Sequence, residues 1–264
     1  EEPLNRGMKL VKNMDGTRNS HTSHAEAMIS LDGKARENSG RVIGLALEWG
    51  GNYELRFQTN DSDYHHVFAG ICPDNAPYAL AKGESFRTPA LAYSYSGQGL
   101  SGVSRNFHRW GRKYRLAHGD VERKVLLNSW EGVYFNINEP GMDQMMGDIA
   151  SMGGELFVMG DGWFGVKYPR KDDCSSLGDW QVDSNKLPGG IGRLVEMADA
   201  HGIRFGIWIE PEMTNSVSEL YEKHPDWVLK APGRDNVYGR GGTQLVLDLA
   251  NPRVEDFVFG IVDG

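Results

Sequence analysis

Short runs of alternating apolar and polar residues dominate the first 118 positions, and this pattern predicts β-strands. Turn-forming residues separate the runs, as in GGN at 50–52 and NDSD at 60–63. Closely spaced strands joined by turns predict an antiparallel sandwich. The expected strands cover residues 41–49, 52–59, 65–71 and 84–96.

Apolar residues recur at helical spacing directly after these strands. Intervals of four, three and four positions place side chains on one face of a helix. The residues with this spacing are Val103, Phe107, Trp110 and Tyr114. We expect a linker helix over residues 99–116 that packs on the domain that follows.

From about residue 120, apolar strands alternate with amphipathic helices. This alternation predicts a parallel sheet covered by helices, and near-continuous apolar strands predict burial on both faces. Asn138 is expected to cap a helix, and Gly153 and Gly202 are expected to follow helix ends. The predicted strands are 124–130, 155–159, 203–210 and 243–249, and the predicted helices are 138–153, 189–202, 216–224 and 251–262.

The number of strand–helix pairs predicts a partial barrel. A complete (β/α)₈ barrel takes roughly 250 residues, and only four pairs are present. We predict a β-sandwich portion with its linker helix at 1–118 and the first half of a (β/α)₈ barrel at 119–264. The chain starts without Met and ends inside a predicted helix. We therefore expect a fragment. No signal peptide opens the sequence as given, and among the locations, which the sequence does not specify, a cytoplasmic one is favoured.

Composition excludes several classes of protein. The hydrophobic fraction of 39% and charged fraction of 24% are typical of a globular chain. A net charge of −8 gives no electrostatic basis for binding nucleic acid, and no apolar run is long enough to span a membrane. Cys72 and Cys174 form no metal or disulfide pattern. We expect no cofactor, no metal ion, and no nucleic-acid or membrane partner.

Acidic and aromatic residues gather where the predicted parallel strands end, which is where ligands bind in barrels and open sheets. Carboxylates accept hydrogen bonds from sugar hydroxyls, and Trp stacks on a pyranose ring. Together they predict a carbohydrate ligand, although any one of these residues alone is more often a turn former, a helix cap or part of the core. The residues are Asn128, Trp130, Glu131, Asp161, Trp163, Phe164, Trp208, Glu210, Glu212 and Asp248.

Two of these acids suggest catalysis by their spacing. Glu210 and Glu212 lie two positions apart and would point the same way from a strand, and glycoside hydrolysis uses a pair of carboxylates. Pro211 between them favours a structural or substrate-orienting role equally. The polar loop from Gly165 to Leu187 is expected to form a wall of the site.

Several segments together resemble bacterial α-galactosidases of glycoside hydrolase family 36. They are SFRTPALAYSYSGQGLSGVSRNFHRW, NSWEGVYFNIN, FVMGDGWFG, SSLGDWQVDSNKLPGGI, FGIWIEPEM, HPDWVLKAPGR and QLVLDLANPRV. The resemblance implies a β-supersandwich, a (β/α)₈ barrel and hydrolysis of terminal α-1,6-linked galactose from melibiose- and raffinose-type sugars. It also implies retention of configuration, no metal or other cofactor, and a homo-oligomeric full-length parent.

The family places its nucleophile and acid/base Asp on strands after the one at 243–249. The resemblance therefore implies that both lie beyond residue 264. No catalytic residue is expected in this chain, which should be inactive alone.

The resemblance carries over four substrate contacts, which are Trp130, Asp161, Trp208 and Arg240. Gly160 stands where the family has a second sugar-binding Asp. The segment GRGGTQLVLD has two residues more than the family pattern, which would displace Arg240. The family's Glu-Pro-Glu, matched by Glu210 and Glu212, is not its catalytic pair. The alternatives are a member selective for N-acetylgalactosamine and a non-catalytic carbohydrate-binding relic.

Overall fold

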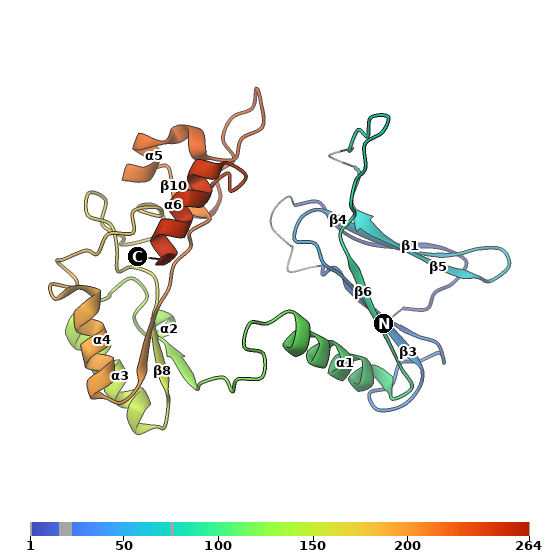
Figure 1. The fold of residues 1–264 in the computed structure, drawn as a ribbon, viewed down its shortest axis with the longest axis horizontal. Coiled ribbons are helices and arrows are strands. Elements are labelled where there is room, and N and C mark those ends of the chain that lie inside the picture. Colours follow the sequence, from blue (N-terminus) through green and yellow to red (C-terminus); the bar gives the residue numbers. More distant parts are fainter. Residues whose placement is uncertain (1, 16–22, 75–76, 264) are drawn as a thin grey trace. The chain divides into compact units, whose positions relative to one another are not determined.

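The computed structural model describes residues 2–15, 23–74 and 77–263. The chain divides into two compact units, Glu1–Val121 and Glu122–Gly264 (Figure 1). Within the described ranges, no helix has the length and apolar character needed to cross a membrane.

Two three-stranded antiparallel sheets form the first unit. Apolar residues of the two central strands are buried between the sheets, and Tyr53 and Leu55 from one sheet cluster with Leu45 and Leu47 from the other. This is the predicted sandwich. The first sheet contains β1 (Gly7–Asn13), β4 (Tyr53–Thr59) and β5 (His65–Ile71), and the second contains β2 (Glu26–Ser30), β3 (Val42–Leu47) and β6 (Leu91–Ser96).

The sequence pattern predicts four of these six strands but not β1 and β2. In β1, Met8 and Leu10 are exposed whereas Lys9 is half-buried, so apolar and polar residues do not separate by face. β6 is also shorter than the predicted 84–96. Pro89 precedes it, and proline has no N–H to donate to a strand ladder.

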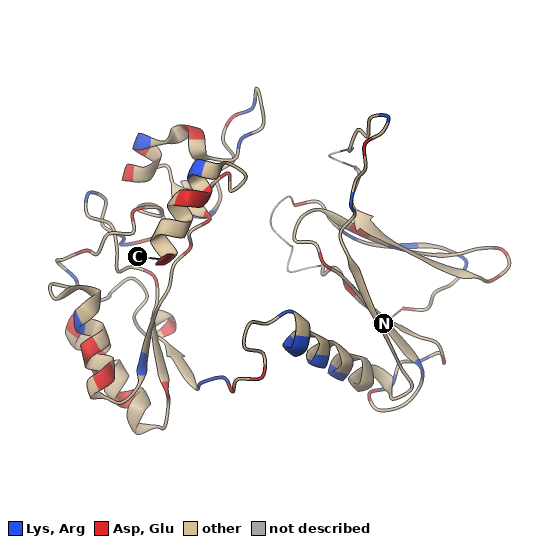
Figure 2. Cartoon of the chain, viewed as in Figure 1, with Lys and Arg blue, Asp and Glu red and all other residues tan. Residues whose placement is uncertain are grey.

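A helix, α1 (Gly99–Tyr114), packs on the sheet of β2, β3 and β6. A Cβ atom on Gly44 of β3 would lie 2.3 Å from Cγ1 of Val103, so glycine permits this close approach. The apolar face of the helix therefore covers the sheet of its own unit, and its packing on the domain that follows stays a prediction. The helix carries four basic side chains and no acidic one (Figure 2), and these are Arg105, Arg109, Arg112 and Lys113.

A parallel sheet of β7 (Leu126–Asn128), β8 (Leu156–Met159) and β9 (Arg204–Ile207) organises the second unit, with β8 in the centre. Two helices, α3 (Glu139–Ser151) and α4 (Gly190–Ala200), pack on it. As predicted, the Asn138 side chain caps α3 by accepting a hydrogen bond from the Gly141 N–H, at 2.9 Å. The core between the sheet and these two helices contains Met142, Met146, Phe157, Met159 and Leu194.

The fourth predicted strand does not join this sheet. β11 (Gln244–Val246) instead pairs antiparallel with β10 (Met213–Asn215). The sequence pattern does not predict this pairing, because a short apolar run could pair with the parallel sheet or with β10. Burial on both faces is also wrong for β7, where Leu126 is exposed. The remaining elements are α2 (Trp130–Val133), α5 (Glu219–Lys223), α6 (Pro252–Asp263) and the 3₁₀ helices η1 (Pro225–Trp227) and η2 (Arg240–Gly242).

Candidate functional site

The ends of β7 and β8 are hydrogen-bonded to each other. The Ser129 hydroxyl accepts from the Gly160 N–H at 2.9 Å, and the Asn128 side chain accepts from the Trp130 N–H at 2.9 Å. A Cβ atom at Gly160 would lie 3.1 Å from Asn128 Oδ1 and 3.2 Å from Trp130 Cβ. Trp130 therefore lies beside Gly160, and a side chain at Gly160 would require these neighbours to shift by a few tenths of an ångström.

Asp161 follows directly and is paired with a buried arginine. Arg170 donates from Nε to Oδ1 at 3.0 Å and from Nη2 to Oδ2 at 2.7 Å, and both side chains are less than a tenth exposed. Arg170 Nη1 also donates to the Ser175 carbonyl at 2.7 Å and to Asn215 Oδ1 at 3.2 Å. A buried charge needs such partners, so Arg170 fixes the plane of the Asp161 carboxylate.

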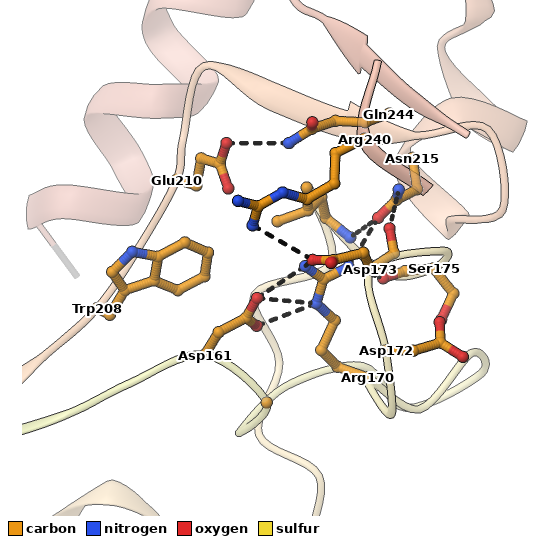
Figure 3. Close-up of polar contacts among 12 residues, drawn as sticks. Asp161, Arg170, Asp172, Asp173, Ser175, Trp208, Glu210, Asn215, Arg240 and Gln244 are labelled. Atoms are coloured by element: carbon orange, nitrogen blue, oxygen red, sulfur yellow. Dashed lines mark hydrogen bonds and ion pairs between the residues drawn. The ribbon is translucent and has the colours of Figure 1, made fainter. Parts of the chain in front are cut away.

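A second carboxylate lies between two guanidinium groups. Asp173 Oδ1 is 3.5 Å from Arg170 Nη2 and 3.5 Å from Arg240 Nη1. Asp161, Arg170, Asp173 and Arg240 thus form a series of alternating charge (Figure 3). It runs from the buried Asp161 to Arg240, whose side chain is 65% exposed.

Trp208 and Glu210 lie beyond the end of β9. The Trp163 indole donates to the Trp208 carbonyl at 3.0 Å, and Glu210 accepts from the Gln244 amide at 2.9 Å. Burial, followed by the charge of Glu212, raises the pKa of Glu210, and two arginines of the charge series oppose this rise. Trp208, Glu210 and Arg240 project toward the same region in Figure 3.

The two glutamates do not form the carboxylate pair that their spacing suggests. The chain turns at Pro211 and Glu212, and the Met213 N–H donates to the Glu210 carbonyl at 3.2 Å. The expectation that both side chains point the same way from a strand is therefore wrong. Glu212 is exposed, whereas Glu210 is half-buried beside Gln244.

One lysine joins the long loop from Gly165 to Leu187 to two other parts of the main chain. The Lys186 ammonium donates to the carbonyls of Phe135 at 2.9 Å, Gly162 at 2.6 Å and Arg170 at 2.7 Å. Burial lowers the pKa of Lys186, and the charge of nearby acids opposes the decrease. Because the loop supplies Arg170, it forms the wall behind Asp161.

Of the four predicted substrate contacts, Asp161 and Arg240 belong to the charge series, and Trp208 lies next to it. Trp130 lies beside Gly160, the residue that precedes Asp161. The sequence reasoning does not single out Arg170 or Asp173. The only signal for them is the charged run PRKDD within the predicted wall. Across the described ranges, no group of three or more His, Cys, Asp or Glu side chains could hold a metal ion.

Two family models match the chain. The model described as "Melibiase" matches residues 85–264, and "Glycosyl hydrolase family 36 N-terminal domain" matches residues 1–81. The chain is 39% identical to α-galactosidase AgaA of Geobacillus stearothermophilus, covering 97% of this chain and 34% of AgaA. It is 36% identical to α-galactosidase Mel36A of Lactobacillus acidophilus, covering 98% of this chain and 35% of Mel36A.

Solved structures give the same result. The α-galactosidase AgaB of G. stearothermophilus matches with a TM-score of 0.89 and 38% identity, covering 99% of this chain and 35% of that one. The fold is thus an N-terminal sandwich portion followed by the start of a (β/α)₈ barrel. The chain spans about a third of the length of the curated relatives it matches. It belongs to the melibiase family, within glycoside hydrolase family 36.

Proposed function

We propose that the chain supplies the galactose-binding residues of a retaining α-galactosidase that acts on melibiose- and raffinose-type sugars. The observation that carries this proposal is the convergence of Trp208, Asp161 and Arg240 beyond the ends of β8 and β9. Structures of AgaA variants in complex with stachyose and with raffinose support it. We assign no catalytic residue within 1–264.

Each proposed contact has a distinct role. Trp208 offers a flat apolar face to the sugar ring, and Trp130 lines the same subsite. Asp161 Oδ1 accepts the Arg170 Nε–H, which it shares with Oδ2, whereas Nη2 donates to Oδ2. Oδ1 therefore keeps a lone pair for a hydroxyl. Arg240 has no acceptor capacity and would donate to a second hydroxyl.

Ligand binding and turnover test this proposal separately. The purified chain is titrated with 1-deoxygalactonojirimycin by calorimetry and incubated with p-nitrophenyl α-galactoside. We expect binding without release of p-nitrophenol. Trp208→Ala should weaken binding at least several-fold, whereas Trp49→Ala, which changes a Trp of the first unit, should not. Absence of binding would refute the proposed site, and turnover would refute the assignment of catalysis to residues outside this chain.

The missing side chain at Gly160 favours a second candidate, a carbohydrate-binding protein without catalysis. Gly160→Asp restores the carboxylate of the family pattern. A charged hydrogen bond to a hydroxyl contributes about 1.5–3 kcal/mol, so affinity should rise roughly tenfold or more if this position contacts the sugar. An unchanged affinity in a folded variant would mean that the position does not contact the ligand. Selectivity for N-acetylgalactosamine is tested by repeating the titration with that sugar.

Two further expectations are part of the proposal. The division into a sandwich portion at 1–118 and a half-barrel at 119–264 stays a prediction, and so does a homo-oligomeric parent. Light scattering on the longest available form of the protein measures the second directly, and a monomer would contradict it.

A further inference from the structure

We propose that Asp173 is a positioning residue that holds Arg240 at the galactose site. The inference rests on the proposed function, because it concerns how a proposed sugar contact is kept in place. Asp173 itself is given no contact with the sugar.

Arg240 needs a partner to stay in one position, because its side chain is 65% exposed and a long exposed side chain has many rotamers. Among the described residues, Asp173 provides the one carboxylate within 4 Å of the Arg240 guanidinium. Asp173 is held in turn by buried groups. Its carbonyl accepts from the Asn215 amide at 3.1 Å, and its carboxylate lies 3.5 Å from the buried Arg170.

The glycines around η2 bring Arg240 to this carboxylate. Gly241 has a φ of +66°, and a Cβ atom on it would lie only 3.0 Å from the Asp173 carbonyl oxygen. The Thr243 hydroxyl donates to the Cys174 carbonyl at 2.8 Å, which ties the same two segments together. The extra residues of GRGGTQLVLD therefore form a turn that closes on Asp173.

The Asp173 carboxylate also lacks an aligned donor. Its Oδ1 is buried without a hydrogen-bond partner, although two guanidinium groups lie 3.5 Å away. An unsatisfied buried acceptor is unfavourable, so a closer approach of a guanidinium group is favoured. Arg170 is held by Asp161, Ser175 and Asn215, which leaves Arg240 as the group that can move.

The first test needs no ligand. The ¹⁵N–¹H nuclear Overhauser effect of the Arg240 Nε–Hε group reports its mobility in the full chain. We expect an ordered group in the wild type and a mobile one in Asp173→Asn and in Gly241→Ala, which opens the turn. Asp172→Asn is the matched control, because an Asn side chain still accepts from the Cys174 N–H as Asp172 does. Equal Arg240 mobility in the wild type and both test variants would overturn the proposal.

The second test is a double-mutant cycle for binding of 1-deoxygalactonojirimycin. If Asp173 acts through Arg240, Asp173→Asn should weaken binding about tenfold and have no further effect in an Arg240→Gln background. A purely structural role would lower affinity equally in both backgrounds, and that additivity would overturn the proposal. Failure of the wild type to bind would refute the proposed function, while the mobility measurement still decides whether Asp173 holds Arg240.

Discussion

The buried pair of Asp161 and Arg170 is the residue-scale feature on which the site depends. Removing one partner of a buried ion pair leaves the other charge uncompensated and destabilises a protein by about 3–5 kcal/mol. Asp161→Asn should therefore lower the free energy of unfolding by an amount near the lower end of that range, since Asp173 still lies 3.5 Å from Arg170. Urea denaturation followed by Trp fluorescence measures the change.

An exposed pair provides the control for this measurement. Arg193 and Glu196 on α4 lie 3.0 Å apart, with more than half of each side chain exposed. Exposed pairs contribute at most about 1 kcal/mol, so Glu196→Gln should have little effect. If Asp161→Asn is no more destabilising than Glu196→Gln, the Asp161–Arg170 pair does not stabilise the fold.

At the scale of elements, the start of α3 depends on its cap. Asn138 accepts from the Gly141 N–H, which would otherwise have no partner in the first turn. Asn138→Ala should lower the free energy of unfolding by about 1 kcal/mol, whereas Asn138→Asp should retain most of the stability. Thermal melts of the three proteins compare them, and equal losses in both variants would show that the hydrogen bond is not the stabilising contact.

The parallel sheet gives a prediction of pH dependence. Glu155 precedes β8 and accepts from the Val125 N–H at 3.0 Å. That hydrogen bond, and then Lys124, lowers the pKa of Glu155 below its ordinary value. A lowered carboxyl pKa stabilises the fold above the ordinary value, about 4.3, and this contribution is lost as pH falls through the lowered value.

Comparison of the wild type with Glu155→Gln isolates this contribution. The wild type should be the more stable of the two at pH 7, by urea midpoint, and the difference should shrink as pH falls below the ordinary carboxyl pKa. A difference that stays constant down to acidic pH would mean that ionisation of Glu155 is not involved.

Periodicity predicts elements better than it predicts their partners. Asn138 and Gly202 mark helix limits by local chemistry, so the helices they flank are predicted well. The pairing of β11 with β10 depends on the turn around Gly241 and on contacts distant in sequence, which no local pattern encodes. Arg170 and Asp173 escape prediction for the same reason, since a polar loop gives no sign of which charges will be buried.

At the scale of the whole molecule, the two units are joined by an exposed segment without helix or strand. Residues 115–125 lie in turns and coil, and nearly all are exposed. The loop from Gly165 to Leu187 is longer but is tied by Lys186 and buries Arg170. Both segments lack regular structure, but we expect only the one that joins the two units to unfold locally with ease.

Limited proteolysis distinguishes the two segments. Arg123 and Lys171 are both exposed, yet trypsin requires local unfolding of the chain around the bond that it cuts. Cleavage at Arg123 should precede cleavage at Lys171, as mass spectrometry of a time course would show. Lys186→Met should accelerate cleavage at Lys171 and leave the rate at Arg123 unchanged. Equal initial rates at the two sites in the wild type would contradict this prediction.

The three carbonyl contacts of Lys186 resemble the way in which proteins use calcium to gather main-chain oxygens. Here the cation is covalently attached to the chain it organises. The order of the loop should therefore be indifferent to chelators and to the supply of free ions, and it needs no separate binding equilibrium. Its vulnerability is chemical instead, because acylation of one amine would remove the charge and two of its three N–H donors at once.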